Sequence, residues 1–123
     1  MATMNDPEDT HGRLIAAGKV NGTSVYDPAG EKLGSIYDVM LDKASGKADY
    51  AIMSFGGFLG MGNSYHPLPW SELSYDEGLG GYVVGIDRSV LEGAPAYDTN
   101  DLTAWEDPTY GRRIDDYYGQ HRI

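Results

Sequence analysis

Few side chains in this sequence could carry out chemistry, and His66 is the most suggestive of them. It lies in the stretch Phe55–Trp70, FGGFLGMGNSYHPLPW. An imidazole there could relay a proton or bind a metal ion. A metal site needs further histidines or spaced carboxylates, and none accompanies His66 in the sequence. The favoured interpretation is a packed ring that hydrogen-bonds a neighbour. The other histidines, His11 and His121, lie near the ends of the chain.

Two aspartates form the second candidate. Asp38 and Asp42 are four residues apart, so a regular strand would place both on one face. Paired carboxylates can perform acid–base catalysis or bind Ca²⁺ or Mg²⁺. An aspartate beside a bulge or turn more often accepts backbone N–H bonds. We therefore predict a structural role for both, and keep an enzyme that uses His66 with Asp38 or Asp42 as the alternative.

The glycine-rich run Gly56–Gly62 has spacings found in phosphate-binding loops. No Lys-Ser or Lys-Thr pair follows it and no helix is expected to begin there, so the phosphate interpretation lacks its context. The serines form no G-x-S-x-G motif, and the chain has no cysteine. We predict no catalytic, cofactor-binding or metal-binding residue, and hence a protein that is not an enzyme.

Composition narrows the choice of partner and compartment. The 123 residues carry a formal net charge of −10, which disfavours direct contact with nucleic acid. No apolar run approaches the length of about 20 residues that spans a bilayer. The N-terminal residues contain acids and no apolar core of a secretory signal. We expect a cytoplasmic protein, with no transmembrane segment.

The remaining sequence predicts a small all-β domain. Seventeen glycines and ten tyrosines are typical of short strands joined by tight turns. The expected strands cover residues 20–26, 33–42, 48–55, 67–75 and 82–86, with a bulge near Tyr37–Asp38. The apolar piece at residues 13–18 is either a first strand or an arm. Asp87 is expected to cap one helical turn over residues 88–92. We divide the chain into a disordered segment (1–12), a domain (13–96) and a C-terminal tail (97–123).

The tail differs from the rest in being acidic, aromatic and partly helical. Leu102 and Trp105 lie in one expected short helix. A second helical piece over residues 109–118 places Tyr110, Ile114 and Tyr117/Tyr118 on one stripe. Such a stripe needs a surface to cover. The tail is expected to dock either on the chain's own domain or on a second copy.

Three motifs in order give the chain a family resemblance: KLGSIYDVMLD at residues 32–42, SFGGFLGMG at 54–62 and HPLPWSEL at 66–73. Together they resemble the PRC-barrel domain, over about residues 20–95. This domain is shared by the cytoplasmic part of the photosynthetic reaction-centre H subunit and the C-terminal domain of the ribosome-maturation factor RimM. The resemblance implies a small closed antiparallel β-barrel of about six strands that acts as an interaction module.

From these observations we expect a non-enzymatic interaction module that self-associates, as a homodimer or higher homo-oligomer, and binds a protein partner. The alternatives are an accessory subunit of a photosynthetic or other membrane electron-transfer complex, and a ribosome-associated factor. No cofactor is expected. The residues predicted to mediate contacts are Phe58, Leu59, Met61, Trp105, Tyr110, Ile114, Tyr117 and Tyr118.

Overall fold

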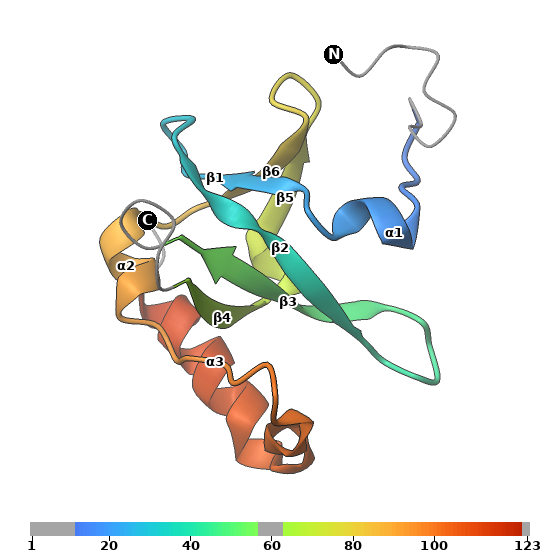
Figure 1. Ribbon diagram of the computed structural model, residues 1–123, viewed down its shortest axis with the longest axis vertical. Coiled ribbons are helices and arrows are strands. Elements are labelled where there is room, and N and C mark those ends of the chain that lie inside the picture. Colours follow the sequence, from blue (N-terminus) through green and yellow to red (C-terminus); the bar gives the residue numbers. More distant parts are fainter. Residues whose placement is uncertain (1–11, 57–62, 122–123) are drawn as a thin grey trace.

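The computed structural model describes residues 12–56 and 63–121 (Figure 1). Its elements in chain order are α1 (Ala17–Val20), β1 (Ser24–Tyr26), β2 (Lys32–Leu41), β3 (Ala48–Phe55), β4 (Ser64–Pro69), the 3-10 turn η2 (Trp70–Glu72), β5 (Leu73–Asp76), β6 (Gly81–Val84), α2 (Arg88–Glu92), the 3-10 turn η3 (Leu102–Glu106) and α3 (Pro108–His121). The apolar piece at residues 13–18 is therefore an arm that leads into α1, and not a strand.

The six strands form one curved sheet in the order β4-β3-β2-β1-β6-β5. The family resemblance implied about six strands, and that number is confirmed. The one strand expected to continue through residue 75 is instead two strands, β4 and β5, with the turn η2 between them. Two further parts of the prediction are wrong. The sheet is a half-barrel and does not close, because its outer strands β4 and β5 are not paired with each other. It is also mixed, because β1 runs parallel to β6 while every other pair is antiparallel.

Two prolines explain why the sheet stays open at β4. The carbonyl oxygen of Tyr65 accepts a hydrogen bond from the Tyr97 N–H at 2.8 Å, so the main chain of Tyr65 faces away from β3. The direction of main-chain bonding alternates along a strand, which gives Pro67 and Pro69 the same outward direction. Proline has no N–H and is tolerated at a sheet edge. At Pro67 and Pro69 the outer side of β4 thus lacks the N–H donors that a ladder to β5 would need.

The long hairpin of β2 and β3 shows why these residues form this sheet. The register shifts between Ile36 and Asp38, so the predicted bulge near Tyr37–Asp38 is confirmed. The shift lets Ile36 be fully buried while Tyr37 is exposed. Gly34 is needed beside β3, since a Cβ there would collide with the backbone oxygen of Ser54.

Helix α3 packs against β4 and completes the core (Figure 1). The predicted stripe lies on one face of the helix, because Tyr110, Ile114 and Tyr118 are its buried residues. The short helix α2 begins as expected at Asp87, whose side chain accepts from the Val90 N–H. The C-terminal region therefore covers one side of the sheet with side chains of its own chain.

Candidate interaction surface

His66 is part of the packed structure. Its ring is buried, with Nδ1 3.1 Å from the Pro95 carbonyl oxygen and Nε2 3.0 Å from the Ser64 hydroxyl. A carbonyl oxygen only accepts, so Nδ1 carries a proton. His66 thus ties β4 to the segment that follows α2, in agreement with the favoured interpretation of a neighbour-bonded ring.

The two candidate aspartates bond to the backbone next to them. The Asp38 carboxylate accepts from the Val39 N–H at the bulge, at 2.8 Å. The Asp42 carboxylate accepts from the N–H groups of Ala44 and Ser45 at 2.9 and 2.8 Å, and these bonds lower its pKa. The predicted hydrogen bonds from the backbone N–H groups are therefore confirmed.

The predicted contact residues of the tail lie against other elements of the same chain. Trp105 packs on Tyr50 and Tyr110, with ring centroids 5.1 and 4.9 Å apart. The Tyr117 hydroxyl donates to the Val90 carbonyl oxygen at 2.6 Å. Tyr110, Ile114 and Tyr118 are buried and so stabilise this fold. The other three predicted contact residues, Phe58, Leu59 and Met61, lie outside the described residues, as does His11.

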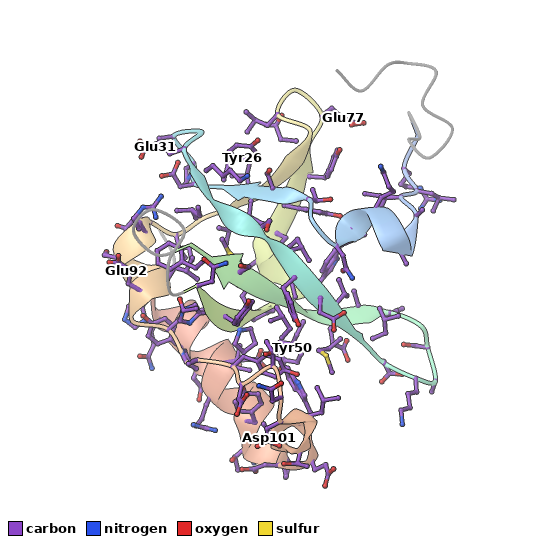
Figure 2. All side chains as sticks on the ribbon, in the orientation of Figure 1. Tyr26, Glu31, Tyr50, Glu77, Glu92 and Asp101 are labelled. Carbon is purple, nitrogen blue, oxygen red and sulfur yellow. The ribbon has the colours of Figure 1, made fainter. Side chains whose placement is uncertain are left out.

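Tyr50 joins the covered side of the sheet to α3 (Figure 2). Its hydroxyl donates to the Asp115 carboxylate at 3.1 Å and lies 3.3 Å from the Gly111 carbonyl oxygen. Partial burial, followed by the negative charge of Asp115, raises the pKa of Tyr50 to about 12. Burial also raises the pKa of Tyr82, Tyr110 and Tyr118. These groups hold their protons tightly, which suits structure and not acid–base catalysis near neutrality.

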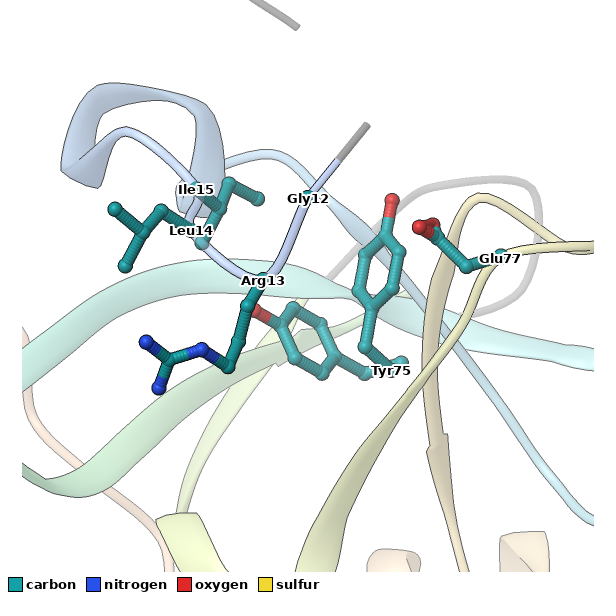
Figure 3. A pocket seen from close by; sticks show the side chains of 7 residues that line it. Gly12, Arg13, Leu14, Ile15, Tyr75 and Glu77 are labelled. Carbon is teal, nitrogen blue, oxygen red and sulfur yellow. The ribbon is translucent and has the colours of Figure 1, made fainter. Parts of the chain in front are cut away.

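The opposite side of the molecule has a hollow of about 280 Å³ between the N-terminal arm and the β5–β6 hairpin (Figure 3). Leu14 and Ile15 line it from the arm, and Tyr75 and Glu77 from the hairpin. Arg13 is the cation among its lining residues. Leu14 is 73% exposed and Tyr75 is 45% exposed.

Two further hollows of about 380 Å³ each lie nearby and share lining residues. The second lies between α1 and the outer end of the β2–β3 hairpin, and Ile15 lines both it and the first hollow. The third reaches α3 at Asp115 and shares Ala48 and Trp70 with the second. We call the three hollows together the apolar groove. Each shares lining residues with the next; the first two are lined mainly by apolar surface, and the third mainly by polar surface that includes Asp49, Ser71 and Asp115.

Exposed apolar side chains are concentrated at this groove. Of the seven large apolar side chains that are exposed among the described residues, four line it: Leu14, Ile15, Leu41 and Tyr75. Scattered exposed apolar residues are ordinary, whereas a gathered group marks an interaction site. Sequence reasoning missed this surface. The apolar run at residues 13–18 was the available signal, but only the fold brings it beside Leu41 and Tyr75.

No other site emerges from the described ranges, 12–56 and 63–121. They contain no group of three or more His, Cys, Asp or Glu placed to bind a metal ion. Within the same ranges, no helix is both long and apolar enough to cross a membrane. The apolar groove is therefore the surface on which a functional argument can rest.

Comparison with known proteins agrees with the sequence motifs. The family model of the PRC-barrel domain matches residues 13–91, which include the arm, all six strands and most of α2. No curated protein matches the chain. The match covers more than half of the chain and ends before η3 and α3.

Proposed function

The chain belongs to the PRC-barrel domain family, and on that premise we propose that it is a non-enzymatic protein-interaction module that binds its partner in the apolar groove. At the family level the domain is an interaction module. The observation that carries the proposal is the gathering of Leu14, Ile15, Leu41 and Tyr75 at one groove. Burying such side chains against a partner releases free energy in proportion to the apolar area removed from water.

We also propose that the protein self-associates when no other partner is present. The exposed apolar side chains at the groove supply the driving force. The net charge of −10 opposes it, so the association is weak and strengthens with salt. Light scattering at increasing protein concentration and two salt concentrations measures this, and a strict monomer under all conditions would contradict it.

Site-specific photo-crosslinking in the native host tests the interaction module itself. A benzophenone amino acid at Leu41 should give a discrete adduct, because this side chain is 55% exposed and lines the groove. The matched probe at Leu102, which is 64% exposed and lies on η3 outside the groove, should not. Equal adducts from both positions, or none from Leu41, would contradict the proposal.

The mass of the adduct also separates the finer alternatives. An adduct of twice the chain mass identifies a second copy. A subunit of a membrane electron-transfer complex or a ribosomal protein in the adduct would support the corresponding accessory role.

A further inference from the structure

We infer that the natural occupant of the apolar groove is an extended, positively charged segment of another protein, in which apolar side chains alternate with lysine or arginine. This inference rests on the proposed interaction function and goes further by naming the chemistry of the partner. It follows from three properties of the groove, namely its shape, its charge and the poor match of this chain's own segments to it.

The three hollows together favour an extended occupant. They have volumes of about 280, 380 and 380 Å³, and the first shares Ile15 with the second while the second shares Trp70 with the third. An occupant that fills more than one hollow therefore has to extend past these shared residues. In an extended segment alternate side chains point the same way, so the side chains of one face enter the hollows and those between them meet the rim.

The charge of the lining selects a cationic segment. Four carboxylates line the three hollows, Glu77 in the first, Asp38 in the second, and Asp49 and Asp115 in the third. Arg13 is the one cation among the described lining residues. Residues that alternate with the apolar anchors therefore meet carboxylates at both ends of the groove. Complementary charge speeds association and rejects acidic competitors.

The chain's own segments fit this groove poorly. Residues 1–11, which precede the arm, contain three acids and neither lysine nor arginine. A second copy carries the same net charge of −10. Repulsion between like charges therefore weakens self-occupation relative to binding of a basic partner.

Fluorescence anisotropy with synthetic probes tests the inference on the full chain. The main probe is a labelled peptide in which leucine alternates with lysine. Two matched peptides replace either all lysines by glutamate or all leucines by serine. We expect binding of the leucine–lysine probe alone, weakened by on the order of tenfold when salt shortens the screening length from about 10 to about 3 Å. Equal binding of the leucine–glutamate probe would overturn the charge argument.

Two pairs of variants locate the probe. The double reversal Glu77→Lys with Asp49→Lys changes both ends of the groove and should weaken probe binding by on the order of tenfold. Its control, Glu31→Lys with Glu92→Lys, changes the net charge equally at exposed positions outside the groove lining (Figure 2). Leu41→Ser should weaken binding, whereas Leu102→Ser should not. Equal losses in test and control would show that the probe binds elsewhere and would overturn the inference.

Failure of this inference can be told apart from failure of the interaction function. If the Leu41 crosslink forms in the host but no leucine–lysine probe binds, the groove has a partner of different chemistry. If neither occurs, both proposals are wrong. If the probe displaces a crosslinked partner whose contacting segment is basic, both are supported.

Discussion

Similar apolar side chains are buried on one side of the small sheet and exposed on the other. On the side of β4, helix α3 buries Tyr110, Ile114 and Tyr118. On the side of the arm and the β2–β3 hairpin, Leu14, Leu41 and Tyr75 stay exposed. Side-chain chemistry is similar in the two regions, so the difference is whether the chain provides a covering element. Among the described residues, the exposed group is the one that α3 does not bury.

The largest expected effect comes from shortening one aliphatic side chain on each side of the sheet to alanine. Ile114 is fully buried and Leu41 is 55% exposed. Ile114→Ala should lower the free energy of unfolding by about 2–5 kcal/mol, through lost burial and the cavity left behind. Leu41→Ala should change it by less than about 0.5 kcal/mol. Urea unfolding followed by tryptophan fluorescence measures both, and similar losses would show that the groove side belongs to the core.

The sequence predicted well those features that depend on neighbouring residues. The bounds of β3 were predicted correctly at residues 48–55. The Asp87 cap, the bulge at Asp38 and the stripe on α3 were also predicted, because each depends on residues close together in the sequence. The open edge, the parallel β1–β6 pair and the groove were not. β1 and β6 pair through Val25 and Tyr82, far apart in the chain. Leu41 is as apolar as the buried leucines, and its exposure depends on which elements pack against the end of β2, which the local sequence does not show.

A second prediction concerns alkaline pH and Tyr50, which bonds to α3 and also lines the third hollow. Burial and the Asp115 carboxylate raise the pKa of Tyr50 to about 12, against an ordinary value of about 10. Between these values the unfolded chain loses a proton that the folded chain keeps. The stabilisation is therefore complete below about pH 10 and is lost as the pH rises toward about 12. Urea midpoints at stepped pH, with near-ultraviolet absorbance of phenolate, should show this decline.

Gly111 supplies a matched control for Tyr50. A Cβ at Gly111 would lie 2.7 Å from the Tyr50 hydroxyl oxygen, so Gly111→Ala must displace that hydroxyl from α3. Alanine favours the helix by up to about 1 kcal/mol, which offsets part of the lost contact. We expect a small change in stability with a lower pKa for Tyr50. An unchanged phenolate titration in both Gly111→Ala and Tyr50→Phe would contradict the assignment.

The smallest changes in the free energy of unfolding are expected for two adjacent tyrosines of α3. They test whether the buried polar groups on the covered side are hydrogen-bonded. The Tyr118 hydroxyl is buried and has no hydrogen-bond partner among the described residues. The Tyr117 hydroxyl, by contrast, donates to the Val90 carbonyl oxygen. Leaving a buried polar group unpaired costs more than removing it. Tyr118→Phe should thus raise the free energy of unfolding by up to about 1 kcal/mol, since the ring is kept and only an unsatisfied hydroxyl is lost.

Tyr117→Phe is the opposite case on the next residue. It leaves the Val90 carbonyl without this donor, so we expect a loss of about 0.5–1.5 kcal/mol. Thermal unfolding of the two variants side by side measures effects of opposite sign from the same atomic change. A loss in Tyr118→Phe as well would mean that a buried water satisfies this hydroxyl. The Tyr118 hydroxyl would then be hydrogen-bonded within the covered side, which would differ even more from the exposed groove.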